Sequence, residues 1–448
     1  MKQLYFQFLF FKPKYFDINQ KYSILSKILN ILYIILPKIF NILYTILPKI
    51  FNMIKRKIVN KLEKFLYTRD IILLYWARQV WKTSLMRYIE KNYFKDKSVF
   101  IDLENIKFLE LLNKNPDIFI EYLKSYHSWV EKNNITVFID EIQYLDNPTS
   151  FLKYIYDNYQ NIKFIVSWSS TLEIRWKLKD SLVWRIIKFD IFPLSFEEFL
   201  IFKQKNNLSK LIDKKNDLEI INNKLKFFYE EFIEFWWYPK VVLSNNVEIK
   251  REYLKQIYST YIEKDIKDIW KIKEVEKFNK LIKILANQSA NLLNISELAN
   301  TVWITIKTVN QWILLLENTF VIKLITPFSN NKRGELIKMP KIFFIDNWIR
   351  NFIDNNYEII WNNFENSVFN NINNSYKTEN INFYRTQDKK EIDFILDWIP
   401  YEVKLNYNYK KLTSLEDFEK KYSQKWKIIT LNKKNNKSFY EIFYPWEI

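Results

Sequence analysis

Residues 71–85 decide the fold of this chain, and they read IILLYWARQVWKTSL, from Ile71 to Leu85. An apolar run is followed by a frame that ends in Lys82 and Thr83, spaced as in the phosphate-binding loop G-x-x-x-x-G-K-[ST]. The two positions that require glycine, 76 and 81, hold tryptophan. The segment therefore predicts a strand, a phosphate-binding loop and the start of a helix.

The chain has one glycine and 16 tryptophans in 448 residues. An average chain of this length carries about 31 glycines, because left-handed turns and close backbone contacts need a residue without a side chain. Our hypothesis is that the gene comes from a lineage that decodes UGA as glycine and was translated as if UGA meant tryptophan. The alternative is a tryptophan-rich protein with a decayed loop, and UGG codons at 76 and 81 would favour it. We expect a genuine tryptophan at Trp312, on an apolar helical face, and glycine at positions 76, 81, 168, 236, 237 and 303.

Composition limits the chemistry and the compartment. With no cysteine and a single histidine, His127, the chain has no disulfide, no thiolate nucleophile and no zinc site built from several histidines or cysteines. A formal charge of +18 suits a nucleic-acid partner. The abundance of Lys, Asn, Ile, Phe and Tyr, whose codons are AT-rich, explains the charge equally well. We expect a cytoplasmic protein.

Residues 1–52 form a repetitive apolar and basic N-terminal extension. An eleven-residue segment that starts at Lys27 is nearly repeated from Lys38. Because Lys38 and Lys49 interrupt the apolar run, we expect no stable transmembrane span. Two interpretations stay open: an interfacial or partner-binding helix, or translation that starts at Met53.

The rest of the chain predicts an α/β fold class with four domains. Residues 53–200 alternate short apolar strands with helical stretches, which is typical of a parallel sheet with crossover helices, here the sheet of a P-loop NTPase (an ATPase core). Residues 201–280 predict a helical lid, residues 281–335 a winged-helix-like unit, and residues 336–448 a nuclease-like α/β domain. The core strands are expected at 71–75, 98–102, 136–140, 163–167 and 186–189.

The loop and a second motif predict a site for ATP and Mg²⁺. Backbone N–H groups at the helix start would wrap the phosphates, Lys82 would add a positive charge, and the Thr83 hydroxyl would reach Mg²⁺. Residues 137–141 are an apolar strand that ends in two acids. Asp140 would hold Mg²⁺, and Glu141 would act as general base on the attacking water. The residues assigned to ATP are Trp76, Ala77, Arg78, Gln79, Val80, Trp81, Lys82, Thr83 and Ser84.

Two further residues are candidates for catalysis. Ser169, with Ser170, follows the next strand, where a polar side chain would contact the γ-phosphate and orient water; a simple turn is the alternative. Arg185 is a candidate arginine finger that acts on a neighbouring subunit of a homo-oligomer, and a plain surface arginine is the alternative.

Part of the winged-helix-like unit resembles a helix-turn-helix. We expect Ser296 to cap the first helix, Trp303 to be the turn position and Thr305 to start the second helix. A DNA reader would direct Lys307 and Gln311 into the major groove. A packing or oligomer module is the alternative. The side chains expected to pack inward are Ala299, Val302, Val309 and Trp312.

The C-terminal residues carry a pattern that resembles the PD-(D/E)xK nuclease core. Asp393 and the pair Glu402-x-Lys404 fall on two successive predicted strands joined by a short turn at Asp397. In that core two acids hold Mg²⁺ and the lysine stabilises charge on the attacked phosphate. Glu365, on the preceding helix, would complete the set. A nuclease-like fold without turnover, or solvated acids on a sheet, are the alternatives.

With glycine restored, residues 53–405 resemble the bacterial AAA-type ATPases that carry a C-terminal domain of unknown function of the DUF4143 type. The resemblance implies ATP binding and hydrolysis but no settled substrate. The leading hypothesis is an ATP-dependent switch or motor that acts on DNA or a protein client. A catalytically dead module that binds DNA or a partner, and an ATP-gated Mg²⁺-dependent nuclease, are the alternatives. The resemblance rests on residues 77–80, 139–143, 192–199, 238–239, 261–266 and 340–344.

Overall fold

The structure is a computed structural model in which the chain divides into two units, residues 1–54 and 55–448. The predicted N-terminal extension, at residues 1–52, lies outside the described part. In the described helices, none combines the length and the apolar character needed to cross a bilayer. The structure describes residues 55–75, 82–126, 134–168, 182, 184–212, 218–235, 241–242, 244, 246–259, 272–328, 339–375, 380–407, 412–433 and 441–448.

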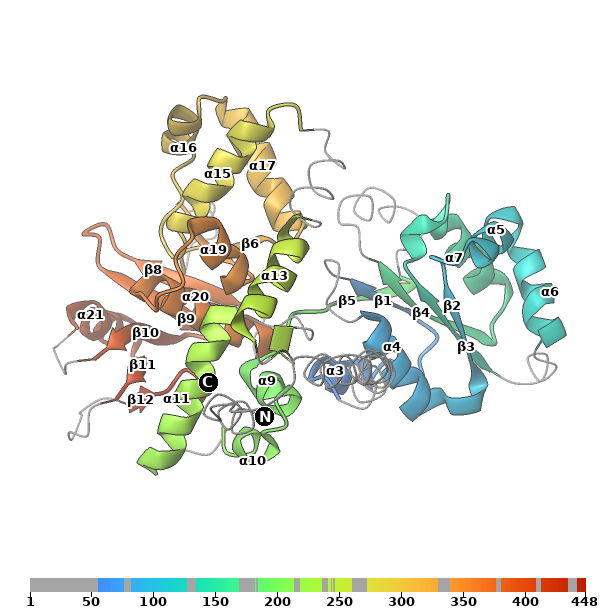
Figure 1. Cartoon of the computed structure of the whole chain (residues 1–448), viewed down its shortest axis with the longest axis horizontal. Helices are drawn as coiled ribbons and strands as arrows, with labels where there is room; N and C mark the ends of the chain where they lie inside the picture. Colours follow the sequence, from blue (N-terminus) through green and yellow to red (C-terminus); the bar gives the residue numbers. More distant parts are fainter. Residues whose placement is uncertain are drawn as a thin grey trace, which may run out of the picture. The chain divides into compact units, whose positions relative to one another are not determined.

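A five-stranded parallel sheet with strand order β2-β3-β4-β1-β5 lies in the N-terminal part of the second unit (Figure 1). The inner strands β1, β3 and β4 are buried along their whole length, as expected for strands covered on both faces. All five predicted core strands are confirmed, within one residue at each end. Their bounds are β1 Ile71–Tyr75, β2 Ser98–Asp102, β3 Ile135–Asp140, β4 Ile162–Trp168 and β5 Ile186–Asp190.

Helices connect and cover this sheet. Helix α5 begins after Asn105, whose side chain accepts a hydrogen bond from the Lys107 amide, and α7 begins with Pro148, which is pre-organised for a first helical turn. Apolar side chains of the covering helices, such as Phe119 and Leu152, pack into one core with the strands. The helices of this part are α3 Ile58–Leu62, α4 Lys82–Ile89, α5 Ile106–Lys114, α6 Pro116–Tyr126 and α7 Pro148–Asn158.

A buried ion pair fixes the segment that leaves the sheet. Ser195 and Glu198 form a capping box at the start of α9, and Arg56 Nε lies 2.9 Å from the Glu198 carboxylate. The described parts of 201–280 are helical, as the sequence predicts, and their role as a lid stays a prediction. The helices are α9 Phe196–Phe202, α10 Asn206–Ser209, α11 Glu219–Phe235 and α13 Val247–Tyr258.

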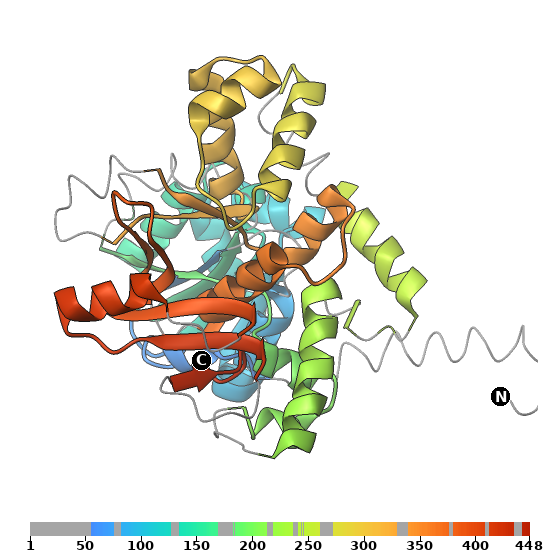
Figure 2. The same cartoon turned by 90° about the vertical axis from the view of Figure 1, so that its left-hand side faces the viewer.

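The predicted helix-turn-helix is present and is followed by a two-stranded antiparallel sheet, β6–β7 (Figure 2, yellow and orange). Thr305 caps the second helix as predicted, since its hydroxyl accepts from the Thr308 amide. The prediction that Ser296 caps the first helix was wrong: Asn294 does so, accepting from the Glu297 amide. The four side chains predicted to pack inward are buried. The elements are α15 Val275–Asn287, α16 Ile295–Val302, α17 Ile306–Asn318, β6 Ile322–Ile325 and β7 Lys341–Phe344.

A second five-stranded sheet, of order β12-β11-β10-β9-β8, forms the C-terminal part. The pairs β8–β9 and β9–β10 are antiparallel, whereas β10–β11 and β11–β12 are parallel, so the sheet is mixed. Helix α20 packs against β10, and α21 against β9. The elements are α19 Asn347–Asp354, α20 Trp361–Ser375, β8 Ile381–Arg385, β9 Glu391–Leu396, β10 Ile399–Asn406, α21 Thr413–Tyr422, β11 Lys427–Asn432 and β12 Glu441–Phe443.

Within the described residues, three tryptophans lie in backbone conformations that favour glycine. Trp184, Trp303 and Trp398 have φ of 70°, 61° and 73°, and their side chains are 94%, 81% and 53% exposed. Trp398 follows Asp397, which also has positive φ, in the two-residue turn between β9 and β10; Asp-Gly is a preferred pair in such turns. Trp168, where the sequence suggested glycine, is instead buried at the end of β4. The positive φ angles of Trp184, Trp303 and Trp398 support the hypothesis that glycine belongs at these turn positions.

Replacing Trp303 or Trp398 with glycine is expected to raise the free energy of unfolding by about 1 kcal/mol each, because a left-handed conformation carries a cost for residues with a side chain. Trp312 is the matched control: its side chain is buried on α17, and Trp312→Gly is expected to lose about 3–5 kcal/mol. Urea unfolding followed by circular dichroism measures all three variants. Losses at 303 and 398 as large as the loss at 312 would contradict the glycine assignment.

Candidate functional site

The carboxyl ends of β1, β3 and β4 meet at one edge of the parallel sheet, which is where open α/β sheets bind ligands (Figure 1). Strand β1 ends at Tyr75 and helix α4 begins at Lys82, as predicted for a phosphate-binding loop. The six residues between them, Trp76, Ala77, Arg78, Gln79, Val80 and Trp81, lie outside the described residues. Ser84, on the first turn of α4, is half-buried.

Asp140, at the end of β3, stands at the centre of this edge. Its side chain is buried, and its carboxylate accepts hydrogen bonds from the hydroxyls of Thr83 and Ser167. Burial raises the pKa of Asp140, while the hydrogen bonds from Ser167 and Thr83 oppose that rise. A carboxylate and a hydroxyl are oxygen ligands of the kind that Mg²⁺ prefers. The pair predicted to hold Mg²⁺, Thr83 and Asp140, is therefore brought together and fits that ion.

Glu141 and Lys82 face each other beside Asp140. The Lys82 Nζ lies 3.4 Å from Oε1 of Glu141, and the lysine side chain is only 4% exposed. Glu141 has a left-handed backbone (φ 55°), a conformation that costs energy and is concentrated at functional sites. Its amide donates to Ser167 Oγ at 2.8 Å, and its carboxylate accepts from the Gln143 amide group. The turn after β3 thus holds the predicted general base next to the predicted phosphate-binding lysine.

Sequence reasoning missed Ser167. It is fully buried in β4, and its hydroxyl contacts both acids of the β3 motif, donating to Asp140 and accepting from the Glu141 amide. A signal was present, since Ser167 is a polar residue inside an otherwise apolar run. The candidate that the sequence favoured, Ser169, lies outside the described residues, and its role stays a prediction.

Arg185 is not brought to this site within its own chain. It directly precedes β5, and its carbonyl accepts a hydrogen bond from the Ile71 amide at the start of β1. Arg185 therefore lies at the N-terminal ends of these strands, whereas the loop follows the C-terminal end of β1. Its guanidinium pairs with Asp157 at 2.8 Å. The finger role toward a neighbouring subunit stays a prediction.

The C-terminal candidates also lie together, around a residue that the sequence did not indicate. Asp393 and Glu402 come from β9 and β10, Glu365 comes from α20, and Lys341 of β7 reaches into the group. Lys404 Nζ donates to Glu402 Oε1 at 2.5 Å. Burial raises the pKa of Glu365 well above its ordinary value and that of Glu402 to about 8, in each case reinforced by the charge of Asp393. In the part of the chain that the structure describes, no group of three or more Asp, Glu or His side chains could hold a metal ion.

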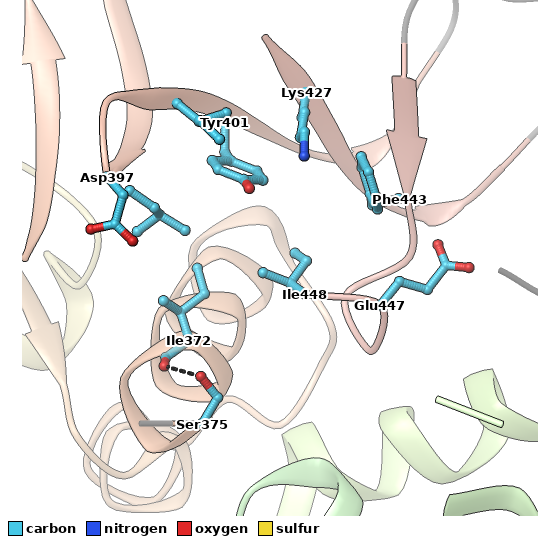
Figure 3. Close-up of a pocket in the computed structure, with 10 residues that line it drawn as sticks. Ile372, Ser375, Asp397, Tyr401, Lys427, Phe443, Glu447 and Ile448 are labelled. Carbon is cyan, nitrogen blue, oxygen red and sulfur yellow. Dashed lines mark hydrogen bonds between the residues drawn. The ribbon is translucent and has the colours of Figure 1, made fainter. Parts of the chain in front are cut away.

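A small pocket opens elsewhere in the C-terminal part (Figure 3). Its volume is about 240 Å³, and its lining is mainly apolar, with Ile372, Tyr401 and Phe443 around it. The Lys427 ammonium lies 3.9 Å from the Glu441 carboxylate. Asp397, Lys427 and Glu447 also line this pocket, but none of its lining residues belongs to the loop motif or to the acid pair that ends β3, so the sheet edge at Asp140 is the stronger candidate.

Three family models match three successive segments of the chain. The family model of an AAA domain matches residues 68–200, and models of two domains of unknown function, DUF8612 and DUF4143, match residues 228–359 and 362–448. An uncharacterized protein of Methanocaldococcus jannaschii is 30% identical over 317 residues, which are 69% of this chain and 68% of that protein.

More distant likenesses were also found. An uncharacterized protein of Haemophilus influenzae is 26% identical over 224 residues, which are 49% of this chain and 52% of that protein. Among solved structures, a RuvB variant of Thermotoga maritima is 13% identical, with 60% of this chain and 90% of that chain covered and a TM-score of 0.29.

Proposed function

Because the chain belongs to the family of proteins that join an AAA domain to a C-terminal DUF4143 domain, we propose that it binds ATP with Mg²⁺ at residues 76–84, hydrolyses it, and uses the cycle as a switch or motor on a client. One observation carries the proposal: the folded sheet brings Lys82 and Thr83 of the loop motif against Asp140 and Glu141 of the second motif. Thr83 and Asp140 are 57 residues apart in the sequence, so their contact depends on the fold and not on local sequence.

Each side chain has a role in this proposal. Lys82 places its charge on the phosphates, and Thr83 and Asp140 hold Mg²⁺. When bound, Mg²⁺ neutralises charge that develops on the phosphates. Glu141 takes a proton from, or orients, the attacking water, and Ser167 keeps both acids in position. Because Lys82 contacts Glu141, binding of phosphates to the lysine would release the glutamate toward water.

We propose DNA as the client, contacted through the helix-turn-helix unit. Helix α17 exposes Lys307 and Gln311 near its N-terminus, the part that enters the major groove in such units. The two-stranded sheet that follows exposes Lys323 on β6, where a wing would meet the DNA backbone. A protein client remains the alternative outcome of the test.

The test measures ATP turnover by the full chain with glycine at 76 and 81, with and without duplex DNA, together with DNA affinity by fluorescence anisotropy. We expect turnover that Lys82→Ala removes. Lys307→Glu is expected to weaken DNA binding about tenfold, whereas Lys283→Glu, an exposed lysine of α15 in the same unit, is the matched control. Equal effects of both substitutions, or turnover indifferent to DNA, would point to a protein client; no turnover at all would contradict the ATPase.

A further inference from the structure

Lys341 occupies the centre of the acidic cluster in the C-terminal domain. Its Nζ lies 2.6 Å from Glu391, 3.1 Å from Glu365 and 3.4 Å from Asp393, and the side chain is 1% exposed. Burial alone would lower the pKa of Lys341, but the charges of Glu365, Asp393 and Glu391 raise it above its ordinary value. The ammonium therefore stays charged, with three carboxylates for its three donors.

One oxygen of Glu365, one of Glu402 and both oxygens of Asp393 already have partners. Oδ1 of Asp393 and Oε1 of Glu365 face Lys341, and Oδ2 of Asp393 accepts from the Val403 amide at 2.8 Å. Glu402 Oε1 accepts from Lys404. Mg²⁺ requires near-octahedral oxygen ligands at about 2.0–2.1 Å. The residues present do not fit a divalent ion, which would have to lie among these oxygens and against a buried ammonium.

The backbone holds Lys341 where it is. It is the first residue of β7, paired with Ile325 of β6, and it also bridges to Leu292. The next residue, Ile342, donates its amide to the Asn291 carbonyl at 3.1 Å. The paired backbone places the side chain of Lys341 at the cluster, and moving its buried ammonium away would break three ion pairs.

We propose that Lys341 is the resident cation of this cluster, that the C-terminal domain binds no divalent metal there, and that it does not cleave phosphodiesters. The inference is independent of the proposed ATPase, because none of these residues belongs to the sheet edge at Asp140. The oxygens Oε2 of Glu365 and Oε2 of Glu402 are buried without a hydrogen-bond partner. They face a cluster that already holds the Lys341 ammonium, with Lys404 paired to Glu402 beside it.

The experiment titrates the full chain with Mn²⁺ alone, without nucleotide, and follows free Mn²⁺ by electron paramagnetic resonance. We expect the wild-type chain and Asp393→Asn to give the same titration, since no Mn²⁺ site depends on Asp393. Lys341→Met is expected to gain a Mn²⁺ site that is lost again in Lys341→Met with Asp393→Asn. Lys341→Arg, which keeps the charge, is the matched control and should gain none.

A wild-type Mn²⁺ site that Asp393→Asn abolishes would overturn the proposal, as would Mg²⁺-dependent nicking of plasmid DNA that the same substitution removes. If Lys341→Met does not fold, the comparison of wild type with Asp393→Asn and with Glu402→Gln still decides the question. Because Asp140→Asn changes only the ATPase site, it identifies Mn²⁺ bound there and keeps the two sites distinguishable.

Discussion

The chain with glycine at positions 76 and 81 is expected to bind ATP with Mg²⁺, and the chain with tryptophan at both positions is expected to bind it at least about 100-fold more weakly, a difference of ~2.7 kcal/mol. A phosphate-binding loop works through backbone N–H groups that approach the phosphates closely. An indole at either glycine position would fill the space that the phosphates need. Isothermal titration calorimetry with a non-hydrolysable ATP analogue measures the difference.

The two single variants separate the positions. Trp76→Gly and Trp81→Gly alone are each expected to restore only part of the affinity, because each leaves one side chain in the loop. Trp303→Gly, at an exposed left-handed turn outside the ATPase core, tests whether a general change in glycine content affects binding and is expected to leave the ATP site unchanged. Tight ATP binding by the chain with both indoles would contradict the account of the loop, and weak binding by the double-glycine chain would favour a module without ATPase activity.

Glu141→Gln, made in the double-glycine chain, is expected to lower the rate of ATP hydrolysis by about 10²–10⁴-fold and to leave ATP affinity nearly unchanged. The amide keeps the size of the side chain but cannot accept a proton from water. The substitution also removes the negative charge that pairs with Lys82. That charge competes with the phosphates for the lysine, so its loss should not weaken ATP binding. Single-turnover hydrolysis and equilibrium binding measure the two quantities separately.

Ser167→Ala is the companion variant for this prediction. It removes the hydroxyl that contacts Asp140 and the Glu141 amide, so it should slow hydrolysis less than Glu141→Gln but by a measurable factor. If Glu141→Gln hydrolyses ATP at the rate of the parent chain, Glu141 is not the general base. The site would then need another residue in that role.

The ATPase core could be predicted closely because its signals are local. Apolar runs such as residues 135–140 are long enough to specify buried strands, and the spacing from the β1 strand to Lys82 specifies a loop. Thr305 and Trp303 were likewise predictable, since a cap and a left-handed turn depend on a few neighbouring residues. Asn294 was missed as a cap because Ser296, two positions later, is an equally good capping residue type.

Contacts between residues that are far apart in the sequence could not be predicted from such local signals. Lys341 is 24 residues from Glu365 and 52 from Asp393, and only the pairing of β6 with β7 and the packing of α20 bring it into the acidic cluster. In sequence it is one of many lysines. The nuclease-like pattern of Glu365, Asp393 and Glu402 was visible, whereas the cation that occupies its centre depends on tertiary structure.

The most direct measurement is tandem mass spectrometry of the protein isolated from its native cells, on the peptides that contain positions 76 and 81. If a triphosphate is to fit between the end of β1 and Lys82, both residues must be glycine. The expected result is therefore the residue mass of glycine at positions 76 and 81. Indole side chains at both positions in the native polypeptide would contradict it.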